Sequence, residues 1–481
     1  MNVECLLFCL VAIPLFGSLL LPLLGKISGQ LRNFFALALM LCSLGISCYL
    51  LPVIANDQTI TVTLGGVSLF YADKLAIFMA LVSQSVGSII ILYSFGYIKH
   101  YHHRNEYYFM VVLFLAAMMG LVFSSNLLWI YFFWEITAIA CWRLIGFFRE
   151  RECVLRADKA FFITIFGALM MLCGFLMIYD QTGTFDLQQI KAYCVAHGSI
   201  ADVAILFILF GILSKSATLP LHTWLPDAGV APSPVTALLH AAVLVKIGVY
   251  VFARLFVATF TVNEIWWEIV PWIAAISALV SACAALVEND IKRIVAYSTV
   301  SQLAFIFLGL AVHNEVSILG GMLYIFMHGV AKAGLFLCAG IIEHETHNKD
   351  IRKMGGLIKT MPITAISFGL CAFSVMGIPP FGGFFSKYMV INGTLESGQI
   401  AVGMTFVVGA FLTLAYLLRV FIRVFFGASR ADADGHEMPR EGSPVMVFSV
   451  AFLAVFALLS GVLIRMPFQF AQSAVQQMLS R

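Results

Sequence analysis

The chain has 481 residues, of which 61% are hydrophobic and 11% charged, and its mean hydropathy is +0.97. This balance excludes a water-soluble domain of that length and indicates a polytopic membrane protein. The net charge of +3 gives no sign of nucleic-acid binding, and the eleven cysteines form no C-x-x-C pair. We therefore expect no nucleic-acid partner, and no metal, iron–sulfur cluster, haem or other cofactor in this chain.

Fourteen segments are long and apolar enough to span a bilayer, which takes about 20 mainly apolar residues. They are 3–24, 31–54, 75–98, 107–123, 126–148, 160–179, 203–220, 233–258, 265–287, 294–312, 317–342, 361–391, 402–426 and 445–466. Because the loops between them are short, the sequence predicts an all-α protein with one membrane domain over residues 1–481.

Lysine and arginine are distributed unequally between the two sides of the predicted bundle. Seventeen lie in or beside the odd-numbered loops, and only Lys74, Lys191 and Arg254 belong to the even-numbered side. Loops rich in lysine and arginine stay cytoplasmic. We therefore expect a multi-pass protein of a bacterial or archaeal cytoplasmic (inner) membrane, with both termini on the non-cytoplasmic side.

Two of the predicted helices are interrupted by proline. The seventh is interrupted at Pro220, just after Lys215, and the twelfth within Gly377–Lys387, where two prolines are adjacent. Proline removes a backbone donor and clashes with the preceding turn. Broken helices at matching places in two halves indicate inverted repeats. The sequence predicts two inverted five-helix repeats, helices 4–8 over 107–258 and helices 9–13 over 265–426.

Six ionisable residues lie inside apolar runs, where a charge is expensive and is by default a functional hypothesis. We predict that they transfer protons: Glu135, Lys215, Lys246, His328, Lys332 and Lys387. His328 and Lys332 are four residues apart and share a helix face. Burial disfavours a charged lysine, whereas a nearby carboxylate favours it. Glu135 is therefore expected to pair with Lys215 and to control its proton.

Four further residues are accessory candidates for the same path. They are His222, His240, Arg143 and Asp290. Arg143 also suits a snorkelling arginine near the cytoplasmic end of its helix. Asp290 lies at a helix end, where an orienting or packing role is the alternative.

Several short motifs accompany these residues. They include Trp134–Thr137, Lys215–Pro220, Trp224–Ala228, Ala231–Ala241, Val245–Tyr250 and Phe384–Lys387. As a set they resemble the antiporter-like membrane subunits of respiratory complex I, Mrp-type cation/proton antiporters and group 4 membrane-bound nickel-iron hydrogenases. Within that family, Cys141–Gly146 and Ile378–Lys387 are most similar to the hydrogenase-4 or formate-hydrogenlyase type.

The resemblance implies a proton-translocating subunit of a membrane-bound oxidoreductase complex, with a group 4 nickel-iron hydrogenase as the first expectation. Redox chemistry would then belong to partner subunits that carry iron–sulfur, nickel-iron or flavin centres, beside homologous antiporter-like subunits and lipid. Three alternatives remain open: a complex I NADH-quinone oxidoreductase subunit, an Mrp-type sodium/proton antiporter subunit, and a structural membrane subunit whose ion pairs are inert.

Overall fold

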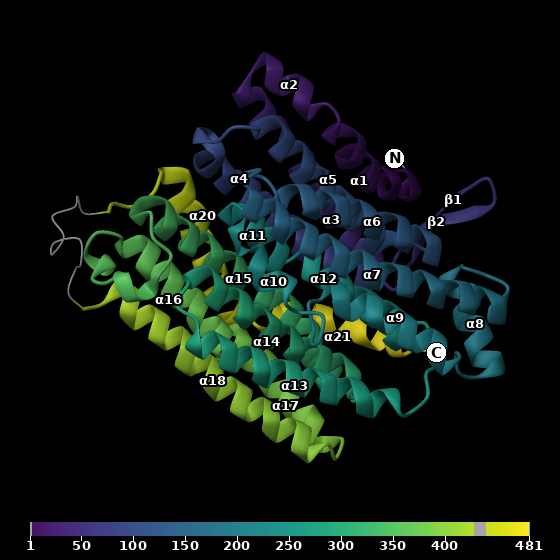
Figure 1. Cartoon of the computed structure of the whole chain (residues 1–481). Helices are drawn as coiled ribbons and strands as arrows, with labels where there is room; N and C mark the ends of the chain where they lie inside the picture. Colours follow the sequence, from purple (N-terminus) through teal and green to yellow (C-terminus); the bar gives the residue numbers. More distant parts are fainter. Residues whose placement is uncertain (1, 428–438, 481) are drawn as a thin grey trace.

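Long apolar runs fold as helices because a helix satisfies its own backbone hydrogen bonds in lipid. A computed structural model describes residues 2–427 and 439–480 and shows a bundle of helices packed side by side (Figure 1). By length and composition, eleven of the helices in these ranges could cross a membrane. The number is twelve if α1 (Val3–Ser18) and α2 (Leu21–Ile27), which meet at 49°, form one span.

The remaining helices follow in chain order. In the first half they are α3 (Gly29–Ala55), α4 (Lys74–Tyr97), α5 (Arg104–Phe123), α6 (Leu127–Ile145), α7 (Arg151–Thr182), α8 (Leu187–His197), α9 (Asp202–Lys215), α10 (Trp224–Asp227), α11 (Ser233–His240) and α12 (Leu244–Phe252). In the second half they are α13 (Trp266–Val287), α14 (Ile291–Ala311), α15 (Glu315–Thr346), α16 (Pro362–Met376), α17 (Gly382–Glu396), α18 (Ile400–Phe425), α20 (Pro444–Val462) and α21 (Arg465–Leu479).

Every predicted segment contains a helix or a pair of helices, which confirms an α-helical polytopic membrane protein. The count of fourteen full spans is too high by the test of length and composition. The predicted seventh and twelfth spans account for the difference, because they are divided into pieces. These pieces, α9, α16 and α17, have 14, 15 and 15 residues.

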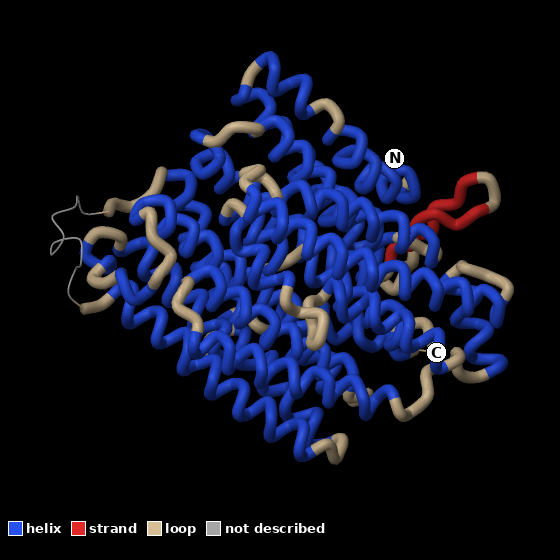
Figure 2. Tube along the Cα trace, viewed as in Figure 1, coloured by secondary structure: helices blue, strands red, loops and turns tan. Residues whose placement is uncertain are grey.

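Between α3 and α4 a short β-hairpin, which is not among the elements predicted from the sequence, stands out from the bundle (Figure 2). Its strands are β1 (Ile60–Leu64) and β2 (Val67–Ala72), paired antiparallel. The two turn residues, Gly65 and Gly66, have φ of 59° and 81°. Two adjacent residues with positive φ match the right-handed twist of a hairpin, and glycine adopts them at least cost.

Two helices with one buried face, α8 and α21, lie outside the predicted spans, apart from the first two residues of α21. The apolar side of α21, which includes Ala471 and Val475, is buried, and the helix contacts α4 and α15. A helix with one polar face has a low mean hydropathy, so a search for continuous apolar runs misses it.

The two predicted breaks are present, and both lysines lie within two turns of them, as expected. Helix α9 ends at Lys215 itself, earlier than the predicted end at Pro220, because Ala217 adopts a left-handed φ of 49°. Helix α16 ends at Met376, and Lys387 follows in the second turn of α17. The breaks therefore leave helix ends next to both lysines.

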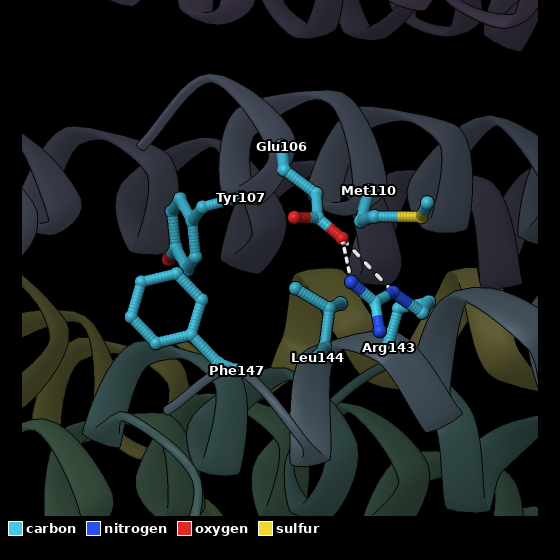
Figure 3. A pocket seen from close by; sticks show the side chains of 6 residues that line it. All are labelled: Glu106, Tyr107, Met110, Arg143, Leu144 and Phe147. Atoms are coloured by element: carbon cyan, nitrogen blue, oxygen red, sulfur yellow. Dashed lines mark hydrogen bonds and ion pairs between the residues drawn. The ribbon is translucent and has the colours of Figure 1, made fainter. Parts of the chain in front are cut away.

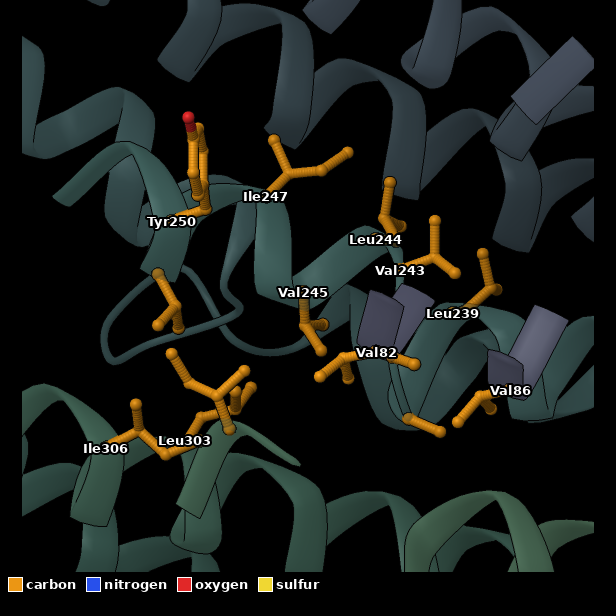
Figure 4. Packing of buried hydrophobic residues seen from close by; sticks show 14 of the residues in the cluster. Val82, Val86, Leu239, Val243, Leu244, Val245, Ile247, Tyr250, Leu303 and Ile306 are labelled. Atoms are coloured by element: carbon orange, nitrogen blue, oxygen red, sulfur yellow. The ribbon is translucent and has the colours of Figure 1, made fainter. Parts of the chain in front are cut away.

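The predicted eighth helix is divided as well, between His240 and Lys246, which the sequence does not predict. Helix α11 ends at His240 and α12 begins at Leu244, although no proline or glycine lies between them. The Ser83 hydroxyl of α4 donates to the carbonyl of Ala242 at 3.0 Å. Figure 4 shows the apolar side chains around this break packed with those of α4 and α14. Tertiary contacts therefore stabilise the break.

A local arrangement occurs twice along the chain. Asn126, which precedes α6, forms an isolated β-bridge with Asp186 beyond α7, and Asp290, which precedes α14, forms one with Asp350 beyond α15. Helices α7 and α15 have 32 residues each. This recurrence is consistent with two related halves, while their boundaries and inverted relationship stay predictions.

Both termini lie at one end of the bundle (Figure 1). The ring of Phe8 in α1 lies 6.4 Å from that of Phe70 in the hairpin, and Lys191 of α8 donates to the carbonyl of Ser480 at 2.9 Å. Which side of the membrane this end faces stays a prediction.

At the opposite end, one carboxylate joins three helices. Asp227 of α10 forms ion pairs with Arg156 and Lys159 of α7, at 2.7 and 2.8 Å, and with Arg293 of α14, at 2.9 Å. Burial favours the neutral acid, but hydrogen bonds from Lys159 and Arg293 outweigh it and hold the pKa of Asp227 below its usual value. The charged carboxylate therefore stabilises the fold.

We expect Asp227→Asn to lower the free energy of unfolding at neutral pH by about 1–3 kcal/mol, because three cations lose their shared partner. Since the folded pKa is depressed, this contribution is full above the unfolded value near ~3.9 and disappears as pH falls through the folded pKa. Thermal unfolding of the full chain in detergent between about pH 7 and pH 3 measures the effect. The control is Asp57→Asn, whose side chain is 79% exposed and pairs with Lys74 alone. Equal shifts for both variants would contradict the prediction.

Candidate functional site

Lys215 lies at the end of α9, against the middle of α6. Its side chain is fully buried, and Nζ donates to the carbonyl of Trp134 at 3.2 Å and lies 5.1 Å from the centroid of the Trp134 ring. Glu135 is the next residue, yet no ion pair between Glu135 and Lys215 is present within the described ranges. One carboxylate oxygen of Glu135 is buried without a hydrogen-bond partner. The predicted partners are therefore neighbours that do not touch in this structure.

The end of α9 packs closely against α12, which carries Lys246. A Cβ atom at Gly248 would lie 2.0 Å from the Ser216 hydroxyl oxygen and 2.7 Å from the carbonyl of Ile212. Only glycine permits this approach of the two helices. The contact brings the segment that holds Lys215 next to the one that holds Lys246.

Lys246, His328 and Lys332 meet at the centre of the bundle, and all three side chains are fully buried. Lys246 Nζ lies 3.0 Å from His328 Nδ1. One turn further along α15, Lys332 Nζ donates to the carbonyl of Val295 at 3.0 Å and to the hydroxyl of Ser298 at 2.6 Å. The predicted shared face of His328 and Lys332 on α15 therefore contacts α12 through His328 and α14 through Lys332.

Lys387 occupies the break between α16 and α17. Its Nζ donates to the carbonyl of Val375 at 2.8 Å and lies 4.6 Å from the Phe305 ring centroid and 5.7 Å from that of Tyr324. The last carbonyls of a helix lack partners within it and attract cations. The break thus supplies both a carbonyl acceptor and the negative end of a helix dipole.

Hydrogen-bonded side chains connect the surroundings of Lys332 and Lys387, and the sequence did not single them out. The Tyr324 hydroxyl donates to Gln302 Oε1 at 2.6 Å, Gln302 Nε2 donates to the Tyr416 hydroxyl at 3.4 Å, and the Tyr416 hydroxyl donates to Ser298 at 2.8 Å. A periodic signal is present: Ser298 and Gln302 are four residues apart, and Tyr324 is four residues before His328.

Arg143 and Asp290 lie apart from this axis. Arg143 forms an ion pair with Glu106 of α5 (Figure 3). Glu106 also pairs with Arg149, at 2.6 Å. Asp290 caps α14 by accepting from the backbone N–H groups of Lys292 and Arg293, at 2.8 and 3.1 Å. Arg143 thus forms an ion pair rather than the snorkelling arrangement that the sequence suggests, and the helix cap of Asp290 agrees with an orienting role. Whether either residue takes part in proton transfer stays a prediction.

The two accessory histidines differ. His240 is fully buried, its ring lies 4.4 Å from that of Phe336, and neither ring nitrogen has a hydrogen-bond partner. His222 is half-buried in the segment after α9. No hydrogen bond links it to a buried lysine in the part of the chain that the structure describes. Of these two histidines, only His240 is as deeply buried as the lysines of the bundle centre.

Two features define the chemistry of this buried axis of Lys215, Lys246, His328, Lys332 and Lys387. None of its lysines forms an ion pair with a described acidic residue. In addition, buried polar atoms along it lack protein partners: Trp134 Nε1, Ser216 Oγ, His328 Nε2 and both ring nitrogens of His240. Buried polar groups are normally hydrogen-bonded, and ordered water satisfies those without a protein partner. The axis therefore combines lysine and histidine side chains with unsatisfied polar atoms, which is the chemistry that proton transfer requires, and the transfer itself stays a prediction.

Comparison with known proteins identifies the chain's relatives. Residues 124–413 match the family described as NADH:quinone oxidoreductase/Mrp antiporter, transmembrane, and residues 67–108 match the complex I chain 5 N-terminus. The Na(+)/H(+) antiporter subunit A1 of Staphylococcus aureus is 31% identical over 95% of this chain. The chain spans 62% of the length of that relative.

Two solved structures show the same fold. A chain of the Mrp complex from Dietzia sp. DQ12-45-1b superposes with a TM-score of 0.90 at 22% identity, over 100% of this chain and 98% of that one. A chain of the membrane-bound sulfane sulfur reductase, an archaeal respiratory membrane complex, gives 0.89 at 22% identity, over 98% and 97%. Because the first family match covers more than half of the sequence, the chain belongs to the NADH:quinone oxidoreductase/Mrp antiporter family of transmembrane proteins.

Proposed function

We propose that the chain is the proton-carrying subunit of a multisubunit Mrp-type sodium/proton antiporter. The observation that carries the proposal is the 3.0 Å contact between Lys246 and His328, with Lys332 one helical turn further along α15. All three side chains are fully buried and have no acidic partner among the described residues. The similarity to an antiporter subunit A1 favours this function over the hydrogenase that the sequence puts first.

The proposed mechanism is electrostatic. When Glu135 approaches Lys215, the carboxylate stabilises the charged lysine; when it withdraws, Lys215 releases its proton towards Lys246. At 4 Å and an effective dielectric of 20, such an ion pair is worth about 4 kcal/mol before desolvation, or roughly three powers of ten in proton occupancy. In this proposal, we assign the separated arrangement of Glu135 and Lys215 to the releasing state.

From Lys246 the proton passes to His328, whose ordinary pKa range lies near neutrality. Lys332 receives it one turn away, and the hydroxyl and amide groups from Ser298 to Tyr324 continue towards Lys387. Inert packing by ion pairs, the structural alternative, is less well supported, because these lysines have no acidic partner in the part of the chain that the structure describes.

A second candidate is a proton pump in a respiratory or hydrogenase complex. The similarity of Ile378–Lys387 to hydrogenase-4 subunits and the fold shared with a respiratory sulfane sulfur reductase favour it. In that case a redox partner, rather than a sodium gradient, would drive the same axis.

Everted membrane vesicles of the native host, with and without the chain, separate these functions. With a proton gradient imposed, sodium addition should dissipate the gradient only in vesicles that contain the chain. Acidification driven by hydrogen or NADH that requires the chain, together with a co-purifying nickel-iron or flavin subunit, would decide for the second candidate. Neither activity depending on the chain would refute both.

A further inference from the structure

A polar cleft lies away from the lysine axis, between the turn that joins α2 to α3 and the connection from α4 to α5. Its volume is about 810 Å³, and a neighbouring cleft of about 680 Å³ shares three of its lining residues, Gly29, Arg32 and Arg104. Both belong to the end of the bundle that the distribution of positive charges predicts to be cytoplasmic. We call the two together the basic cleft.

Four cations line the basic cleft: Lys26, Arg32, Lys99 and Arg104. Within the described ranges none of them forms an ion pair. The acidic residue of the lining, Glu106, is already paired with Arg143 (Figure 3) and with Arg149. The cleft therefore holds an excess of positive charge with no counter-charge from its own walls.

Arg32 is the buried member of this group, with 4% of its surface exposed. Its guanidinium lies 4.6 Å from the Tyr108 ring centroid and donates to the amide oxygens of Asn105, at 2.5 Å, and Asn33, at 2.7 and 3.1 Å. These acceptors fix the orientation of the charge but do not neutralise it. A buried charge without a counter-ion is costly, so the site is built for an anion.

The wall that continues from the cleft is apolar. Along α2 and α3 the side chains of Leu23, Ile27, Leu31 and Phe34 are 56%, 77%, 45% and 64% exposed, and Phe34 itself lines the cleft. Cations beside an exposed apolar surface at a membrane boundary match a molecule with an anionic head and hydrocarbon tails. A soluble anion would make no use of the apolar wall.

We propose that the basic cleft binds an anionic phospholipid, with the phosphate against Arg32, Lys26 and Arg104 and the acyl chains along α2 and α3. The headgroup of the bound lipid would lie between the turn that joins α2 to α3 and the start of α5. This proposal is independent of the transported ion and of the proton path.

The test measures lipid binding to the full chain, in its complex, in phosphatidylcholine nanodiscs. Phosphatidylglycerol with the same acyl chains is titrated, and bound lipid is counted by native mass spectrometry. Each basic side chain near a headgroup contributes about fivefold to affinity. We therefore expect Lys26→Gln/Arg104→Gln to weaken phosphatidylglycerol binding about 25-fold, and Arg32→Gln to weaken it as well if that variant folds.

The matched control is Lys353→Gln/Lys359→Gln, which removes two exposed cations from a loop on the same predicted side and should leave binding unchanged. Equal binding of phosphatidylcholine and phosphatidylglycerol, or equal binding by the Lys26/Arg104 variant and the wild type, would overturn the proposal. Competition by inorganic phosphate at the lipid's own affinity would identify a soluble-anion site instead. A partner subunit in the cleft of the assembled complex would also overturn it.

Discussion

Replacing Lys332 is expected to block proton transfer, with a rate at least about a hundredfold below that of the wild type, the scale on which positioned acid–base groups act. Its Nζ links Val295 and Ser298 of α14 to the His328 face of α15, and its side chain is fully buried. Lys332→Ala tests the loss of the base, and Lys332→Met keeps most of the volume. Sodium-dependent proton movement in everted vesicles is the measurement.

Two companions make this result specific. His328→Gln should slow transfer less, because an amide and ordered water can replace part of the hydrogen bonding to Lys246. Lys359→Ala, at an exposed loop lysine, should leave the rate unchanged. If Lys332→Met transports at the wild-type rate in an assembled complex, the relay through the centre of the bundle is refuted.

Glu135→Gln is expected to reduce coupled transfer about ten- to a hundredfold while the complex still assembles, because it removes the charge and keeps the shape. The structural reason lies at one junction: Glu135 follows Trp134, whose carbonyl accepts from Lys215. Without the carboxylate, Lys215 has no switchable partner. Glu268→Gln, at an exposed position of α13, is the control and should transport normally.

The two variants also separate conduction from control. Lys332 variants should block passive proton flow as well as coupled exchange. Glu135→Gln should impair coupled exchange more than passive flow, since the bases of the axis remain. Normal coupled transport by Glu135→Gln would show that another group controls Lys215.

The sequence by itself determined the class of protein and singled out the buried lysines and His328. Apolar runs located the helices because a lipid environment accepts few alternatives to a helix. Lys246, His328 and Lys332 stood out because each is expensive in an apolar run, and the structure brings these three together. The hairpin also has a local sequence pattern, Gly65–Gly66 between β-branched and aromatic residues. This pattern is not an apolar run, so it does not appear among the predicted spans.

Only the tertiary structure decided how these groups are connected. No proline or glycine marks the break between His240 and Lys246 in the sequence. The break is stabilised from outside the segment, by the Ser83 hydroxyl of α4, which donates to the carbonyl of Ala242. The network from Ser298 to Tyr324 joins α14, α15 and α18, helices whose mutual rotation no local pattern fixes. Likewise, Lys215 donates a hydrogen bond to the carbonyl of Trp134 and forms no ion pair with Glu135. The packing of α9 on α6 determines which acceptor the lysine reaches.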